Sequence, residues 1–311
     1  MVARHELVPE PSCVADAFSR DARPVLSISP GDEVVVETLD ALGHLERPRF
    51  PGDDRPKMFP VFRGHCLAGP IEVEGARPGD VLAVHLRSVR PADWGFTMAG
   101  VHDTALNRHL GIDKRHWLLW EIDHAKGVAR CDLGYEVGLR PFLGVIGLAP
   151  TEPGEHTTFP PRYCGGNLDC RELVAGTTLF LPVGVEGALL YLGDGHAAQG
   201  DGEVAGTAVE CPMTTELVVD VVPEPVLEVL HATTPVGRIT FGLSTSLDEA
   251  AAEALDAMVE WLHRHLGCQR VEATALASAA VDLRITQIVN QTFGVHAVWA
   301  DDRLRAPAVT R

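Results

Sequence analysis

Short apolar runs that end in turn residues constrain the fold of this chain more than any other feature of its sequence. Between residues 25 and 89, such runs stand on both sides of two Pro-Gly-Asp turns, at 30–32 and 78–80. Runs of this length bounded by Pro and Gly predict strands. Because the segments around the two turns resemble each other, we interpret them as two hairpins with the same turn chemistry. A small internal duplication is the alternative.

The middle third shows the same pattern of buried strands. Apolar runs there lie between prolines and glycines, which is typical of strands with both faces covered. Weaker periodicity precedes them, between 91 and 132, where we expect a loop that leads into one further strand. The strands predicted in this region are at Trp117–Ile122, Phe142–Leu148, Thr177–Val183 and Ala188–Leu192.

Helical periodicity begins near the C-terminus. In Asp248–Leu266 apolar side chains recur every three or four residues, behind a capping Ser246 and before Gly267. This pattern predicts an amphipathic helix with a capped start and a glycine stop. A second helix at Val271–Ala280 and an alternating strand at Asp282–Asn290 are predicted to follow.

The chain is long for one domain, but no part of it resembles a linker. Its 311 residues exceed the usual range of about 100 to 200 residues per domain, and no low-complexity segment divides them. We expect a single unit over 1–311, with a β-rich part over about 1–240 and a mixed α/β part over about 241–311. The predicted fold class is therefore α+β and β-rich.

Charge and hydropathy exclude several classes of partner. The net charge of −17 repels nucleic-acid phosphates and anionic membranes, so neither is an expected partner. The longest apolar stretch, 179–192, is broken by Pro182 and Glu186 and is too short to span a bilayer. Because the first residues lack the apolar core of a signal peptide, we expect a cytoplasmic protein.

Seven cysteines, an odd number with no Cys-x-x-Cys pair, predict neither a disulfide framework nor a thiolate zinc site. We interpret most of them as reduced and buried. Cys164 and Cys170 flank a Gly-Gly-Asn-Leu-Asp motif at 165–169. Small apolar filler is the favoured interpretation of these two, and a metal ligand or a nucleophile are the alternatives.

Polar residues gather most densely in 162–203. The segment 193–203 combines glycines, which permit close backbone approach, with side chains that act as ligands, donors or acceptors. These side chains are Asp194, His196, Gln199, Asp201 and Glu203. A Gly/Asp turn with solvated carboxylates is the simpler interpretation, but the composition of the whole region favours a site. Imidazole and carboxylate groups suit zinc, so the candidate ligands are His196, Asp169 and, from a remote part of the chain, His65.

Four groups of motifs, spread from about residue 25 to 298, resemble the acetamidase/formamidase family. The first is the segment 69–76 with Pro-Gly-Asp at 78–80. The others are 165–169 with 172–183, 193–203 with Gly-Thr-Ala at 206–208, and 244–251 with 282–287. One departure is Glu72, which stands where many family members have an aromatic residue.

This resemblance implies a hydrolase that cleaves the carbon–nitrogen bond of a small linear amide, of the formamide or acetamide type, and releases ammonia and a carboxylate. It also implies a divalent metal that activates water, held by His65, Asp169 and His196. Zinc is the expected ion, with manganese or calcium as alternatives. Glu74 or Glu203 would take a proton from the water and return it to the leaving nitrogen.

The same resemblance gives Asn167 and Gln199 a role as hydrogen-bonding partners of the substrate. It implies a sandwich-like or barrel-like β body with an α/β C-terminal portion, and association into dimers or larger homo-oligomers. Hydrolysis of a lactam or another cyclic amide, and binding of a metal or small ligand without catalysis, are the alternatives. The sequence has no Walker loop, Rossmann glycine motif or Gly-x-Ser-x-Gly elbow, so neither a nucleotide cofactor nor a serine nucleophile is expected.

Overall fold

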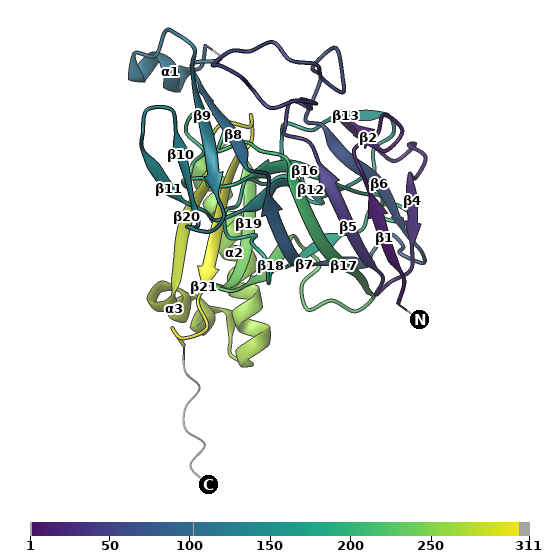
Figure 1. Cartoon of the computed structure of the whole chain (residues 1–311). Helices are drawn as coiled ribbons and strands as arrows, with labels where there is room; N and C mark the ends of the chain where they lie inside the picture. Colours follow the sequence, from purple (N-terminus) through teal and green to yellow (C-terminus); the bar gives the residue numbers. More distant parts are fainter. Residues whose placement is uncertain (1, 102, 305–311) are drawn as a thin grey trace.

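Two large β-sheets form the core of the protein (Figure 1). The computed structural model describes residues 2–101 and 103–304. The larger sheet has nine strands, in the order β1 (Arg4–Leu7), β5 (Glu33–Thr38), β17 (Met213–Val222), β7 (Val81–Pro91), β15 (Thr178–Pro182), β18 (His231–Thr234), β19 (Gly237–Ser244), β21 (Phe293–Trp299) and β20 (Val281–Gln287).

The second large sheet has six strands. Its order is β14 (Gly165–Asn167), β12 (Phe142–Leu148), β16 (Leu190–His196), β6 (Leu67–Val73) and β2 (Val14–Ala15), and β4 (Leu26–Ile28) pairs with β6. One core cluster holds Val34 and Val84 from the first sheet together with Ile146 and Leu190 from the second. The two sheets therefore pack face to face as a sandwich, which confirms the predicted β-rich fold class.

Smaller elements complete the β body. A four-stranded sheet runs in the order β11 (Glu136–Gly138), β10 (Val128–Cys131), β9 (His116–Asp123) and β8 (Trp94–Ala99), and a short pair joins β13 (Glu155–Thr157) to β3 (Ala17–Ser19). Helix α1 spans Ala105–Leu110. Strand β9 confirms the strand predicted near Trp117–Ile122. Strand β12 has the predicted bounds, whereas β16 starts two residues late and continues to His196.

The hairpin interpretation of the two Pro-Gly-Asp turns is wrong. Strands β4 and β6, which precede the turns, pair with each other in parallel, through contacts such as Leu26 with Ile71. Strands β5 and β7, which follow the turns, lie on either side of β17 in the nine-stranded sheet. Each turn therefore carries the chain from one sheet to the facing one. Turn residues specify a reversal of direction, but burial of both inner faces decides which strand becomes the partner.

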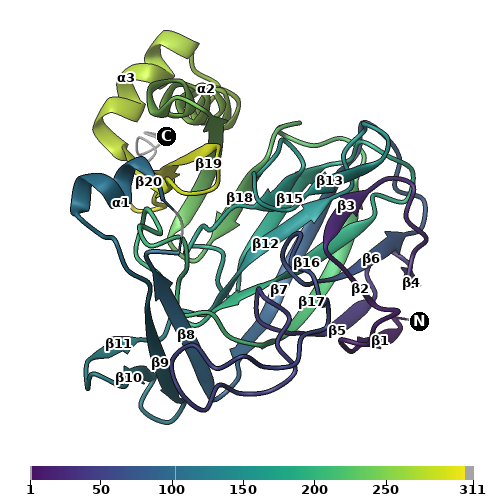
Figure 2. The same cartoon turned by 90° about the horizontal axis from the view of Figure 1, so that it is seen from above.

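The C-terminal part extends the nine-stranded sheet and covers it with two helices (Figure 2). Helix α2 (Leu247–Leu266) starts at Ser246, whose side chain accepts from the Glu249 amide, and stops at Gly267 with φ of +64°. Helix α3 (Arg270–Ala280) follows. Both agree with the predicted helices. No helix within the described residues is long and apolar enough to cross a membrane.

Gly242 on β19 marks the closest approach between this sheet and α2. A Cβ atom at Gly242 would lie 1.8 Å from the backbone oxygen of Ala250 and 2.6 Å from the nitrogen of Ala254. We predict that Gly242→Ala lowers the free energy of unfolding by about 3 kcal/mol, because the helix must move away from the sheet. Urea denaturation measures the loss. Gly138→Ala, in open space on β11, is the matched control and should change stability little; equal stability of both variants would refute this packing.

Candidate functional site

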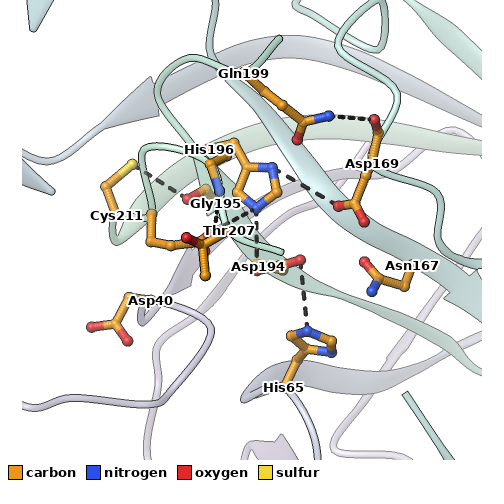
Figure 3. Close-up of polar contacts among 12 residues, drawn as sticks. Asp40, His65, Asn167, Asp169, Asp194, Gly195, His196, Gln199, Thr207 and Cys211 are labelled. Carbon is orange, nitrogen blue, oxygen red and sulfur yellow. Dashed lines mark hydrogen bonds and ion pairs between the residues drawn. The ribbon is translucent and has the colours of Figure 1, made fainter. Parts of the chain in front are cut away.

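Five ionisable side chains are buried together where β16 ends. They are Asp169, Asp194, His196, Glu203 and Glu210, and none is more than 7% exposed. Strand β16 carries Asp194 and His196. Asp169 lies just after β14, and the two glutamates lie between β16 and β17. Figure 3 shows the His196 ring between Asp169 and Asp194, with His65 beyond Asp194.

Gly144 makes room for this cluster. It lies on β12, the strand between β14 and β16, and the pairing of β12 with β16 skips Gly144 and Asp194. A Cβ atom at Gly144 would lie 2.5 Å from Asp194 Oδ2, 2.6 Å from Asp169 Oδ1 and 2.8 Å from His196 Cε1. The three side chains therefore converge over a residue that has no side chain of its own.

Three of the carboxylates sit on unusual backbone. Asp169, Asp194 and Glu203 have φ values of +48°, +58° and +46°, in the left-handed region that residues other than glycine rarely adopt. Each such residue costs on the order of 1 kcal/mol or more and persists only where its surroundings hold it. Strain at three acidic residues of one cluster points to a functional site.

His196 contacts acidic groups on both sides of its ring. Its Nδ1 lies 3.9 Å from Asp169 Oδ1, and its Nε2 lies 3.4 Å from Asp194 Oδ1 and 3.2 Å from Glu210 Oε1. Potential ligand atoms of His196, Asp169 and Glu203 all lie within 4.8 Å of one another, and so do those of His196, Asp194 and Glu210. The imidazole is therefore shared by two groups of possible metal ligands.

Burial makes negative charge expensive at three of these positions. It raises the pKa of Asp169 to about 7, with Asp194 adding to the effect. Burial, together with the charge of Asp169, raises the pKa of Glu203 well above its usual range. Burial and Asp194 raise the pKa of Glu210 to about 7. The cluster holds more acidic groups than its own bases neutralise.

The other two groups are held in their charged forms. Burial opposes the charge of Asp194, but the His196 and His65 imidazoles outweigh it and keep the pKa of Asp194 low. Burial also opposes a proton on His196, but the charges of Glu210 and Asp194 outweigh it and raise the pKa of His196 well above its usual range. A bound cation would take over the role of that proton.

Several buried polar atoms of this region have no hydrogen-bond partner. They are Asp169 Oδ1, both ring nitrogens of His196, Glu210 Oε2, Asn167 Oδ1 and Gln199 Oε1. Buried polar atoms without partners are costly, so their concentration in one place calls for a ligand. Nitrogen and carboxylate donors with an excess of negative charge fit a divalent cation such as zinc or manganese.

The structure brings together two of the three predicted metal ligands, Asp169 and His196, and adds Glu203 to them. His65 is not part of this group of ligand atoms; its Nε2 lies 4.0 Å from Asp194 Oδ2 and its Nδ1 2.7 Å from Thr158 Oγ1. Burial lowers the pKa of His65, which favours the neutral imidazole. His65 therefore borders the cluster on the Asp194 side.

Both predicted amide side chains lie at the cluster. Asn167 Nδ2 donates to the Phe159 carbonyl at 3.0 Å, and Gln199 Nε2 donates to the Asp169 carbonyl at 2.7 Å. These bonds hold the nitrogen ends of the two amides and leave each amide oxygen unpaired. Asn167 and Gln199 can thus accept hydrogen bonds from a ligand in the cluster.

The structure does not bring Glu74 to the cluster. Its carboxylate is exposed and accepts from Ser29 Oγ at 2.9 Å. Strand β6 begins beside the site, where Leu67 pairs with Gly193, and it carries Glu74 away beyond its other end. The sequence alone could not distinguish Glu74 from Glu203. Only the direction of β6 in the folded sheet shows that Glu74 lies away from the cluster.

The two cysteines beside the motif at 165–169 have the properties of filler. Cys164 is buried and its Sγ donates to the Leu148 carbonyl at 3.4 Å, while burial raises the pKa of its thiol to about 11. Burial raises the pKa of the Cys170 thiol well above its usual range, with Glu172 adding to the effect. A nucleophilic cysteine needs the opposite shift.

Glu210 and Asn290 were not among the residues predicted from the sequence. Asn290 Nδ2 donates to Asp169 Oδ2 at 2.5 Å, which leaves Asp169 Oδ1 free to face His196. The Asn290 backbone N–H in turn donates to Gln287 Oε1 at 3.1 Å, so the end of β20 holds this loop in place. Neither residue lies in a polar motif, and only the fold brings them to the cluster.

Comparisons with known proteins agree on one family. A family model described as the Acetamidase/Formamidase family matches residues 5–157 and 154–299. A formamidase of Methylophilus methylotrophus is 26% identical over 232 residues, which is 58% of this chain and 56% of that protein. The chain thus spans about half the length of the curated relatives it matches.

Solved structures match over nearly the whole chain. The crystal structure of an acetamidase from Bacillus halodurans has a TM-score of 0.85 at 30% identity, and the match covers 95% of this chain and 97% of that one. A gamma lactamase from Delftia acidovorans is more distant, with a TM-score of 0.64 at 21% identity over 98% of this chain and 95% of that one. That second likeness shows a common fold only.

Filling the space above Gly144 tests the cluster as a metal site. We predict that Gly144→Ala weakens zinc binding by about a hundredfold, because the new methyl group displaces Asp169, Asp194 and His196. Isothermal titration of metal-free protein with zinc measures the affinity. Gly138→Ala is the control, since its methyl group meets nothing within 4 Å. Unchanged zinc affinity in Gly144→Ala would place any metal elsewhere.

The pH dependence of the metal-free protein follows from the raised pKa values of Asp169 and Glu210. Each group binds its proton more tightly in the folded state, so its contribution to stability is complete below its ordinary pKa near 4 and is lost as pH rises to about 7. We predict that chelator-treated protein melts at lower temperature as pH rises over this range. Added zinc should restore the melting temperature at pH 7, and Asp169→Asn should flatten the slope. A slope that Asp169→Asn leaves unchanged would contradict this assignment.

Proposed function

Because the chain belongs to the acetamidase/formamidase family, we propose that it hydrolyses the carbon–nitrogen bond of a small linear amide to ammonia and a carboxylate. The observation that carries this proposal is the buried cluster around His196. It combines strained backbone, unpaired ligand atoms and an excess of acidic groups in a chain that matches the family from residue 5 to 299.

Asp169 and His196 are the proposed ligands of a divalent ion, with zinc as the preferred metal and manganese or calcium as alternatives. Asp169 Oδ1 and His196 Nδ1 lie 3.9 Å apart and neither has a hydrogen-bond partner, so both would be available to hold an ion. Such an ion, when bound, polarises the amide carbonyl and lowers the pKa of water toward about 7.

Neighbouring side chains hold these two ligands in place. Glu210 and Asp194 face His196 Nε2, so in the neutral ring they favour the proton on Nε2 and leave the Nδ1 lone pair toward Asp169. Asn290 binds the second oxygen of Asp169. These contacts select the tautomer of the histidine and the oxygen of the carboxylate that act as ligands.

Glu203 is the proposed carrier of protons. Burial and Asp169 raise its pKa well above the usual range, which strengthens the carboxylate as a base for the attacking water and keeps more of it protonated to donate to the leaving nitrogen. Asn167 and Gln199 present unpaired amide oxygens for the substrate's N–H groups. His65, neutral and beside Asp194, borders this space on the other side.

Ammonia release from formamide, acetamide and a small lactam tests this function. We predict release from the linear amides that falls about a thousandfold after chelation, returns with zinc, and falls as far in His196→Ala. His109→Ala, an exposed histidine on α1, is the matched control and should retain full activity. Glu203→Gln should lose turnover while it retains metal.

Each contrary result points to a definite alternative. Activity that survives both chelation and His196→Ala would refute the metal mechanism. Preference for the lactam would support the cyclic-amide alternative. Stoichiometric metal without release from any amide would support a protein that binds without catalysis.

A further inference from the structure

Three arginines converge on one buried carboxylate close to the proposed site. Glu172 is fully buried, and its Oε1 lies 2.7 Å from Arg284 Nη1, 3.5 Å from Arg171 Nε and 3.6 Å from Arg140 Nη2. Burial opposes the charge of Glu172, but His296 and the arginines outweigh it and lower its pKa to about 2. Glu172 is therefore an anion at every ordinary pH.

The Glu172 carboxylate cannot accept hydrogen bonds from all the N–H donors of three guanidinium groups. The only other acidic partner of the three among the described residues is Asp201, whose Oδ1 lies 3.1 Å from Arg171 Nε. Three positive charges thus meet two negative ones. The side chains of Arg140, Arg171 and Arg284 are 35%, 31% and 32% exposed, so part of each reaches solvent, whereas Arg171 Nε is buried and has no hydrogen-bond partner. An excess of positive charge is unusual in a chain of net charge −17.

This arginine cluster, made of Arg140, Arg171 and Arg284, borders the proposed site through the backbone. Arg171 lies two residues after Asp169. The Arg140 amide donates to the carbonyl of Ala197, the residue after His196. Arg284 is on β20. On the same strand, the Thr286 carbonyl accepts a hydrogen bond from the backbone N–H of Gly202, the residue before Glu203. Each arginine is therefore tied to a segment that carries a proposed site residue.

The same surroundings argue against a cation here. Ligand atoms of Cys170, Glu172 and His296 lie within 4.8 Å of one another, which by itself suggests a metal site. The guanidinium groups already neutralise Glu172, and a divalent ion would meet their repulsion. The balance of charge selects an anion instead.

We propose that Arg140, Arg171 and Arg284 form a subsite for a small carboxylate beside the amide-cleaving site. Guanidinium groups match the planar carboxylate through paired N–H donors, and this is their preferred ligand together with phosphate. The proposal rests on the proposed function for its chemistry, because hydrolysis of an amide releases a carboxylate. The ligand is either that product or a second carboxylate on the substrate itself.

Acetate binding tests the subsite without turnover. The wild-type chain, as purified and at constant ionic strength, should bind acetate in isothermal titration, and Arg140→Gln should bind it about tenfold more weakly. Arg140 is chosen because its ion pair is the longest of the three and Glu172 keeps its two other arginines. Arg130→Gln is the matched control, since Arg130 is exposed and pairs with Glu136 rather than with Glu172 or Asp201. Arg140→Lys should recover part of the affinity.

Equal acetate affinity in wild type and Arg140→Gln, or no binding by wild type, would overturn the subsite. If Arg140→Gln does not fold, as judged by circular dichroism and melting temperature, Arg171→Gln replaces it. Loss of acetate binding in Arg140→Gln together with absent ammonia release from every amide would keep the subsite and refute the proposed function.

Kinetics then separate the two sources of the carboxylate. The test substrates are the half-amide of a dicarboxylic acid and a neutral amide of the same length. If the substrate's own carboxylate is the ligand, Arg140→Gln should raise KM about tenfold for the half-amide only. If the product is the ligand, KM should stay unchanged for both and inhibition by acetate should weaken about tenfold. A change of kcat alone, equal for both substrates and without weaker acetate inhibition, would show a structural role and contradict the subsite.

Discussion

The energetic cost of burying several carboxylates around one imidazole is the constraint on which the rest of this structure depends. Asp169, Asp194, Glu203 and Glu210 are taken out of water beside His196, and burial drives three of them toward the protonated form. An apolar sandwich does not stabilise such a group by itself. A bound cation, as proposed, would resolve the conflict most directly, because it would balance the charge and accept the unpaired lone pairs.

The fold is organised to hold these groups at short range. Gly144 leaves space in the middle of the second sheet, so side chains from two neighbouring strands meet over β12. Asp169 and Asp194, both at positive φ, place their carboxylates in that space, at a cost in backbone strain that the surrounding core supports. The C-terminal part takes part as well, because Asn290 reaches across to Asp169. The β body and the α/β part therefore build one site.

A second buried carboxylate meets the same problem with a different counter-charge. Glu172 is compensated by arginines, whereas the acids around His196 lack such partners. The surroundings of Glu172 therefore carry an excess of positive charge, and the cluster around His196 carries an excess of negative charge. Neighbouring surroundings of opposite sign suit a reaction whose proposed cofactor is a cation and whose proposed product is an anion.

Local pattern determined what kinds of element this chain forms and which residue types carry its chemistry. Strand β12, helix α2 and helix α3 follow from periodicity and capping, and the glycine-rich segments around Asp169 and His196 stand out because ordinary loops do not need that composition. Only the tertiary structure decided the partners. The two Pro-Gly-Asp turns change sheets, Glu74 points to solvent, and Glu210 and Asn290 reach the cluster from unremarkable segments. Residues far apart in the chain come together because both inner faces of the sandwich must be buried, and no local pattern encodes that requirement.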